Sequence, residues 1–471
     1  MKNSFNKIYE ESIQNPEEFW KNVSDDVFWF KKPTKILNQS NPPFYKWFED
    51  GVTNTCYNAI DVHIDKGNGE KTALIYDSPI TNSKAKYTYN ELREKISKFA
   101  GALDNQGIKK GDRVIIYMPM IPEAVVAMLA CGRIGAIHSV VFGGFASNEL
   151  ASRIDDSKAK ILITASCGFE PGRTVEYRPL VDGALKLAKH KVEKVILFQR
   201  KNHEVKLNSP LEISWEEALV NAKNKDCVEI GANEFAYILY TSGTTGSPKG
   251  VVHSHNTSMW ALVTFIASTD LRDGDRYLVA LPLFHVGSLV PVTLNIYWGV
   301  TSVVMREFDP LKAWELIPEE KITCSLLVPA MLNFMSQVPN VTGYDYSTLR
   351  WIQSGAAPLP ENLIRTYADW DIEVHQIYGL TEVCGPACVI NAENALKRIL
   401  DVIKKDSSSL NFRVFVTGGG CSGFQYGFKF DEFDKEEDSS YIVNGGDQFR
   451  HGRLGRYDRQ IFLEHIDTQL A

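Results

Sequence analysis

Short apolar runs alternate with longer mixed stretches along this chain, from about Thr72 onward. The runs are rich in Val, Ile and Leu without polar alternation, which is typical of strands buried on both faces of a sheet. Most intervening stretches are long enough for a helix, so the pattern predicts an α/β fold whose sheets are covered by helices. The predicted strands are 112–117, 136–142, 160–164, 192–198, 235–240, 276–281, 300–305, 324–328, 349–353 and 374–378, and the predicted helices include 122–132 and 148–157.

The first 65 residues lack this alternation and are rich in aromatic residues. We expect them to form an N-terminal segment that wraps the main domain. The most apolar region, 124–146, contains Arg133, His138 and several glycines. It therefore predicts a buried helix followed by a strand, and not a membrane span.

The composition narrows the class of protein. The 471 residues give room for two or more domains, and 44% hydrophobic with 23% charged residues are ordinary values for a globular protein. The net charge of −7 argues against a nucleic-acid partner, so an anionic ligand would need local donors. The eight cysteines lack regular spacing and the N-terminus lacks an apolar signal segment, which favours free thiols in the cytoplasm. No second ligand pair follows Cys384 and Cys388, which favours thiols over a zinc site.

One segment, Tyr240–Gly250 (YTSGTTGSPKG), combines hydroxyls, glycines and Lys249 directly after a predicted strand. Glycines let a backbone turn tightly and bring its N–H groups close to an anion, while hydroxyls and a lysine add donors. The segment therefore predicts a loop that binds a polyphosphate, with a polar surface turn as the alternative. It does not match GxxxxGK[ST], because Pro248 and Gly250 stand where that motif needs a glycine and a hydroxyl. Its other hydroxyls and glycines are Thr241, Ser242, Gly243, Thr244, Thr245 and Gly246.

Two further motifs follow predicted strands, SGAAPL at 354–359 and YGLTE at 378–382. Ligands of α/β sheets bind beyond the carboxyl ends of the strands. We therefore expect these two motifs and the phosphate loop to converge on one edge.

The segment YTSGTTGSPKG resembles the phosphate loop of the AMP-forming acyl-adenylating enzymes. Residues 40–64, 111–146 and 165–185 are more specific, because they resemble the propionyl-CoA and acetyl-CoA synthetases of that superfamily. The resemblance implies an adenylate-forming N-terminal domain with stacked β-sheets flanked by helices. It also implies that ATP and Mg²⁺ activate a short-chain carboxylic acid, propionate or acetate, to acyl-AMP, which coenzyme A then converts to acyl-CoA.

The resemblance implies roles for individual residues as well. Tyr378, which precedes Gly379, would stack on adenine, Thr381 would bond the α-phosphate, and Glu382 would coordinate Mg²⁺. A solvated helix start is the alternative for Glu382. Lys249 would stabilise the charge on the leaving pyrophosphate. The turn that would hold the adenine comprises Gly355, Ala356, Ala357 and Pro358.

Two more residues match positions of the family. His285, in LPLFHVGSL, would lie beside the acyl pocket and the adenylate, and a satisfied core histidine is the alternative. Arg173, in EPGRTVEY, would contact a phosphate of coenzyme A, and an ordinary surface arginine is the alternative.

The resemblance changes twice along the chain. Residues 251–395 are more similar to medium- and long-chain fatty-acid CoA ligases, and the adenylating pattern stops after about Ala395. No TGD follows to supply the aspartate that grips the ribose, and we expect the family's C-terminal domain, with its lysine, to be absent. Residues 395–432 instead resemble A-type iron–sulfur carriers, of whose three cysteines only Cys421 is present.

We therefore expect a wrapping segment at 1–65, an AMP-binding domain at 66–395, a partial carrier-like segment at 396–432, and a tail at 433–471. The part after 395 would be a short α+β or disordered tail. The expected function is that of an AMP-forming acid–CoA ligase, impaired by the missing parts. The alternatives are a nucleotide- or acyl-binding protein without turnover, an iron–sulfur carrier, and a natural fusion or composite of separate genes.

Overall fold

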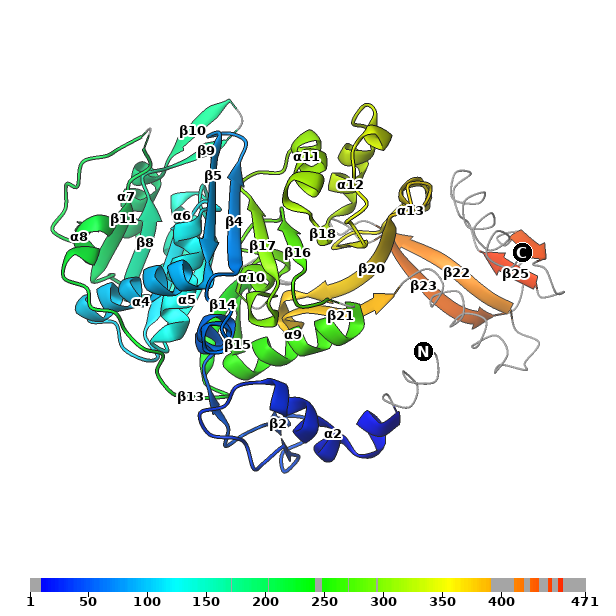
Figure 1. Cartoon of the computed structure of the whole chain (residues 1–471), viewed down its shortest axis with the longest axis horizontal. Helices are drawn as coiled ribbons and strands as arrows, with labels where there is room; N and C mark the ends of the chain where they lie inside the picture. The colour runs from blue at the N-terminus through cyan, green and yellow to red at the C-terminus, as the bar shows by residue number, and fades with distance from the viewer. Residues whose placement is uncertain are drawn as a thin grey trace. The chain divides into compact units, whose positions relative to one another are not determined.

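The computed structural model divides into two units (Figure 1). Unit 1 comprises Met1–Phe308 and Leu380–Gly385, and unit 2 comprises Asp309–Gly379 and Pro386–Ala471. The predicted domain boundaries at 65 and 395 stay predictions. The structure describes residues 10–170, 172–201, 203–241, 248–269, 271–293, 295–390, 411–418, 424–431, 439–442 and 448–451.

A seven-stranded sheet forms the centre of unit 1, in the order β12-β11-β8-β6-β7-β14-β15. Its strands pair in parallel except for β14 and β15, which form an antiparallel hairpin. The predicted strands are confirmed to within two residues at each end, and their continuous burial explains why they read as unbroken apolar runs. The strands are β6 (Arg113–Met118), β7 (Ile137–Phe142), β8 (Ile161–Ala165), β11 (Lys194–Phe198), β12 (Glu212–Ser214), β14 (Phe235–Thr241) and β15 (Lys249–Ser254).

Helices pack against this sheet and against each other (Figure 1). The predicted buried helix is α5 (Pro122–Arg133), which contacts β6 and β7 and is followed by β7, as expected. Helix α4 begins with a capping box, in which Thr88 and Glu91 bond each other's backbone N–H groups. None of the helices in the described ranges is long and apolar enough to cross a membrane. The other helices here are α4 (Tyr89–Asn105), α6 (Ser147–Ser157), α7 (Tyr177–Leu187) and α8 (Trp215–Val220).

A second set of paired strands in unit 1 runs in the order β16-β17-β4-β5. Strands β16, β17 and β4 are parallel, and β4 and β5 form a hairpin. These strands are β4 (Thr72–Ser78), β5 (Ser83–Thr88), β16 (Arg276–Val279) and β17 (Thr301–Met305). The remaining elements of this part of unit 1 are the helices α9 (His255–Thr269), α10 (Val286–Thr293) and η3 (Asn295–Trp298) and the hairpin of β9 (Cys167–Glu170) and β10 (Arg173–Glu176).

The N-terminal segment is attached to the rest of unit 1 by buried polar groups and stacked rings. Phe48 stacks on Trp260 with ring centroids 4.5 Å apart. The Asn54 side chain donates to the carbonyl of Val228 at 2.9 Å, among other carbonyls. The elements are α2 (Pro16–Val23), η1 (Ser24–Asp26), β1 (Leu37–Asn38), β2 (Lys46–Trp47), β3 (Val52–Thr53), η2 (Tyr57–Asp61) and α3 (Val62–Asp65), and β3 pairs with β13 (Ile230–Gly231).

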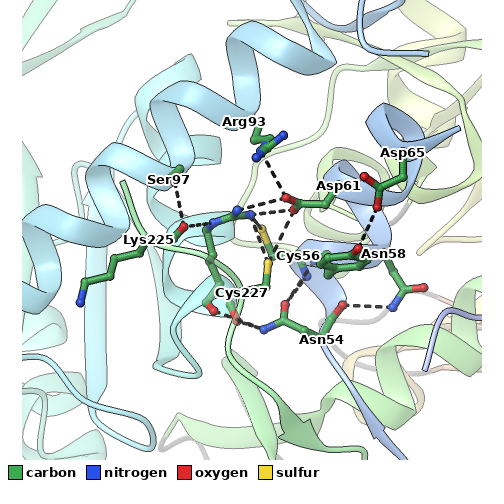
Figure 2. Close-up of polar contacts among 12 residues, drawn as sticks. Asn54, Cys56, Asn58, Asp61, Asp65, Arg93, Ser97, Lys225 and Cys227 are labelled. Atoms are coloured by element: carbon green, nitrogen blue, oxygen red, sulfur yellow. Dashed lines mark hydrogen bonds and ion pairs between the residues drawn. The ribbon is translucent and has the colours of Figure 1, made fainter. Parts of the chain in front are cut away.

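A buried ion pair is a further attachment of this segment. The Arg133 guanidinium donates two hydrogen bonds, of 2.7 and 3.0 Å, to the Asp61 carboxylate. Figure 2 shows Asp61 and its surroundings. Arg133 is 1% exposed and also donates to the carbonyl of Lys225 at 2.6 Å. Two parallel N–H bonds match the geometry of a carboxylate, so this pair fixes η2 against the end of α5.

Unit 2 contains the parallel strands β18, β19 and β20, whose predicted positions are confirmed. Trp314 is 0% exposed and packs among Tyr367 and Trp370. A separate sheet has the order β23-β22-β25-β24. Cys421 and residues 391–410, where the carrier-like segment begins, lie outside the described ranges. The elements are α11 (Pro310–Glu320), β18 (Cys324–Leu327), α12 (Pro329–Ser336), η4 (Val341–Gly343), β19 (Trp351–Gly355), α13 (Glu361–Ala368), β20 (Glu373–Leu380), β21 (Gly385–Ile390), β22 (Asn411–Gly418), β23 (Phe424–Asp431), β24 (Ser439–Ile442) and β25 (Gln448–His451).

Replacing Asp61 with Asn leaves the Arg133 charge buried without its partner. We expect the free energy of unfolding to fall by about 3–5 kcal/mol, because a buried charge without a counter-charge is strongly destabilising. Urea denaturation measures the change. The matched control is Asp25→Asn, which breaks an ion pair to Lys32 that is 65–72% exposed. In this control, the free energy of unfolding should fall by less than about 1 kcal/mol. Equal losses in the two variants would contradict the role of Asp61 as the partner of a buried charge.

Candidate active site

The predicted phosphate loop connects the two strands of a hairpin at the edge of the seven-stranded sheet. Thr241, the last residue of β14, pairs with Lys249, the first residue of β15. Lys249 is exposed. At the base of the loop, the Tyr240 hydroxyl donates to Asp156 at 2.7 Å, and Arg153 lies over the Tyr240 ring at 5.1 Å. Ser242, Gly243, Thr244, Thr245 and Gly246 lie outside the described residues.

The predicted metal-binding motif meets the strand that leaves this loop. Thr381 and Glu382 lie in η5 (Thr381–Val383), and Nε2 of His253, on β15, lies 2.8 Å from the Thr381 carbonyl oxygen. Glu382 is exposed, and its negative charge acts on His253. Four residues, or roughly 13 Å of strand, separate His253 from Lys249. The structure therefore brings Glu382 next to β15, the strand that follows the loop, and both lie within unit 1.

Three aromatic rings lie side by side on the two strands that carry the loop and on the neighbouring strand β7. Tyr237 pairs in register with His138 on β7 and with His253 on β15. Its ring centroid lies 5.5 Å from that of His138 and 4.9 Å from that of His253. Burial, with a smaller effect of His255, lowers the pKa of His138 to about 3. Burial also lowers the pKa of His253, against the smaller raising effects of the Thr381 carbonyl and Glu382. Both imidazoles are therefore neutral at pH 7.

The predicted adenine-binding residues lie together in unit 2. Gly355 ends β19 and pairs with Ile377 of the neighbouring parallel strand β20, one residue before Tyr378. A Cβ at Gly355 would lie 2.2 Å from the Ile377 carbonyl oxygen, so only glycine fits this close approach. Tyr378 is 67% exposed. The two motifs thus share the carboxyl ends of adjacent strands, where Gly379, Ala356, Ala357 and Pro358 are also exposed.

His285 lies at the start of α10 and is accessible to solvent. Its ring centroid is 4.3 Å from that of Phe284, which in turn contacts Phe142 at 4.9 Å and Phe145 at 6.0 Å. The surrounding protein atoms lower the pKa of His285, so the imidazole is neutral at pH 7. A neutral ring on an aromatic cluster is compatible with the predicted position beside an acyl group, which stays a prediction.

Arg173 is the first residue of β10, in the β9–β10 hairpin. Its side chain is 72% exposed and forms an ion pair of 2.6 Å with Glu170 across the hairpin. This is the arrangement of an ordinary surface arginine. The predicted contact with a phosphate of coenzyme A stays a prediction.

Sequence reasoning missed one cluster of ligand-type side chains, which Figure 2 shows. Atoms of Cys56, Asp61 and Cys227 lie within 4.8 Å of one another. The Arg133 guanidinium lies among them, 3.1 Å from the sulfur of Cys227 and 3.8 Å from that of Cys56. Because a cation already satisfies the carboxylate, the cluster does not fit a divalent metal. Cys227 and Arg133 are far in sequence from Cys56 and Asp61, so no spacing could have indicated the cluster.

Comparison with known proteins identifies the family. Residues 62–404 match the model of the AMP-binding enzymes. The chain belongs to this family. Residues 5–59 match the acetyl-coenzyme A synthetase N-terminus, the segment expected to wrap the domain.

The relatives carry the names of acyl-CoA synthetases. The chain is 53% identical over 295 residues to the human "Acyl-CoA synthetase short-chain family member 3, mitochondrial", covering 59% of this chain and 43% of that protein. It is 38% identical over 342 residues to an acetyl-coenzyme A synthetase of Xylella fastidiosa, covering 70% and 52%. The chain therefore spans about half the length of these relatives, or less.

The fold matches a solved structure of the same kind. The acetoacetyl-CoA synthetase from Streptomyces lividans superimposes with a TM-score of 0.72 at 22% identity, over 81% of this chain and 60% of that one. The predicted α/β adenylate-forming fold is thereby confirmed.

The buried imidazole of His138 predicts that the stability of the folded chain depends on pH. The unfolded chain protonates His138 near pH 6.5, but the folded chain does so only near pH 3, so the unfolded state binds more protons between these values. Stability should fall as the pH falls through this window. In the His138→Phe variant, the slope of unfolding free energy against pH should be smaller by up to about 1.4 kcal/mol per pH unit. Urea denaturation of the wild type and the variant at pH 4–7 measures the two slopes. Identical slopes would contradict the low pKa of His138 in the folded chain.

Proposed function

We propose that the chain activates a short-chain carboxylic acid with ATP, as an AMP-forming acid–CoA ligase. The observation that carries the proposal is the position of Glu382, exposed on a turn that is bonded to the exit strand of the phosphate loop. Family membership and the names of the relatives support the same reaction class. Propionate and acetate are the proposed acids.

In the first step, a carboxylate oxygen attacks the α-phosphorus of ATP. A new P–O bond forms while the bond from the α-phosphorus to the bridging oxygen breaks, and pyrophosphate leaves with the electron pair. Lys249 and the backbone N–H groups of the loop would hold the phosphates, and the Thr381 hydroxyl would donate to the α-phosphate. These groups act by orientation and by stabilising charge, so no covalent intermediate with the protein is required.

In the second step, the thiol of coenzyme A attacks the acyl carbon, loses its proton and displaces AMP. Tyr378 and the turn at Gly355 would keep the adenine in place, and His285 would adjoin the acyl group. Arg173 would be the contact for coenzyme A.

The residues fit the magnesium ion that the family implies. Mg²⁺ keeps several waters in protein sites and takes one or two carboxylates together with the phosphates of the substrate. A single exposed carboxylate, Glu382, satisfies this requirement. When bound, the ion would neutralise negative charge on the phosphates.

A second candidate is a protein that binds the nucleotide or acyl group without turnover. The departure of the residues after 395 from the adenylating pattern favours it. The iron–sulfur carrier and the composite origin remain proposals about that same region. The cytoplasm is the proposed compartment, on the irregular spacing of the cysteines. The name of the human relative assigns that protein to mitochondria.

Acid-dependent exchange of pyrophosphate into ATP tests the ligase. We expect exchange with propionate and acetate, and a decline as the acid is lengthened to hexanoate and octanoate. Binding of MgATP without exchange for any acid would contradict the ligase and support the second candidate.

Replacing Lys249 with Ala removes the positive charge at the end of the loop. We expect the exchange rate to fall roughly 100- to 1,000-fold, the usual cost of losing one group that stabilises developing charge. Lys186→Ala, an exposed lysine on α7, is the matched control and should leave the rate unchanged. An unchanged rate in Lys249→Ala would show that this loop does not bind the phosphates.

A further inference from the structure

The turn that carries Glu382 has an unusual backbone for its sequence. Cys384 follows η5 with φ +62° and ψ +30°, the left-handed region that favours glycine. Yet Cys384 is 2% exposed, and its own N–H closes the turn by donating to the Thr381 carbonyl at 3.0 Å. Such a strained residue persists only where its surroundings fix it. Contacts from outside the turn must therefore hold Cys384 in this conformation.

Two side chains from neighbouring strands hold the turn at its two ends. Nε2 of His253, on β15, donates to the Thr381 carbonyl at 2.8 Å, because a carbonyl oxygen can only accept. The hydroxyl of Tyr237, on β14, lies 2.9 Å from the sulfur of Cys384. His253 is 2% and Tyr237 4% exposed, so water does not compete strongly for either bond. The Thr381 carbonyl thus uses both lone pairs, one within the turn and one to the sheet.

Glu382 lies between these two anchors and points its carboxylate away from the buried core, since it is exposed while Cys384 is buried. An ordinary surface glutamate has no comparable support beneath it. A carboxylate that must meet a metal ion gains from a fixed backbone, because the groups behind a ligand set its orientation.

We propose that His253 and Tyr237 are positioning residues, which clamp the 381–384 turn so that Glu382 is aimed at the magnesium of bound ATP. This inference rests on the proposed function, which supplies the metal and the nucleotide. His253 makes the principal contact, because it fixes the carbonyl next to Glu382. Tyr237 contacts the other end of the turn at Cys384, and its ring packs against the imidazole of His253.

The test compares His253→Phe with His253→Gln. Phenylalanine keeps a ring but has no donor, whereas the glutamine amide retains an N–H near the position of Nε2. Binding of ATP is measured by calorimetry at a series of Mg²⁺ concentrations, together with pyrophosphate exchange and the melting temperature. For His253→Phe, we expect the Mg²⁺ concentration at half-maximal binding to rise roughly tenfold or more, the usual effect of removing a group behind a metal ligand. His253→Gln should recover most of the loss.

The matched control is His63→Phe. Nε2 of His63 also lies 2.7 Å from a backbone carbonyl, that of Tyr297, and the residue is 7% exposed. His63 lies in α3, and its contacts among the described residues are with Tyr297 and Tyr89, not with the turn. This variant should lower the melting temperature without changing the Mg²⁺ dependence. If His253→Phe does not fold, Tyr237→Phe removes only the hydroxyl and should shift the Mg²⁺ dependence in the same direction.

The outcomes separate this inference from the proposed function. An unchanged Mg²⁺ dependence in folded His253→Phe would overturn the clamp, and so would an equal shift in His63→Phe. If the wild type binds MgATP but exchanges no pyrophosphate with any acid, the ligase proposal fails, while the binding titration still decides the clamp. If the wild type does not bind MgATP, both fail.

Discussion

The Thr381 carbonyl joins the turn that carries the predicted metal ligand, Glu382, to the central sheet of unit 1. It accepts one hydrogen bond from Cys384 within its own turn and one from His253 on β15. The second bond ties the backbone next to Glu382 to β15, the strand that leaves the phosphate loop. A site that handles a triphosphate needs donors and a metal ligand at fixed separations. Sheet geometry fixes the position of the metal-ligand turn relative to β15.

The sheet geometry depends in turn on buried polar contacts elsewhere in unit 1. The register of His138, Tyr237 and His253 across three adjacent strands sets the position of the clamp. The Arg133–Asp61 pair fixes the N-terminal segment against α5, which packs on β7, the first of those three strands. The N-terminal segment of residues 1–65, of which residues 5–59 match the acetyl-coenzyme A synthetase N-terminus, therefore supports the site through Asp61, although it carries none of the predicted catalytic residues.

Much of the fold could be predicted from the sequence, because its parallel strands are buried and appear as continuous apolar runs. The placement of Gly355 and Tyr378 at the carboxyl ends of adjacent strands followed from the same pattern. The supporting contacts could not be predicted, since His253 and Thr381 are joined only through the tertiary fold. The Cys56, Asp61 and Cys227 cluster was missed for the same reason, because Cys227 is distant in sequence from the other two residues. The roles of His285 and Arg173 depend on ligands and stay predictions.

The central claim is that the phosphate loop and the Glu382 turn bind the same MgATP. Hydrogen–deuterium exchange followed by mass spectrometry tests it directly, with peptides covering 238–252 and 378–386 compared with and without MgATP. The account predicts that both peptides gain protection together, at the same nucleotide concentration, and that ATP without Mg²⁺ protects the loop peptide more than the turn peptide. Protection of only one of the two peptides at saturating MgATP would contradict it.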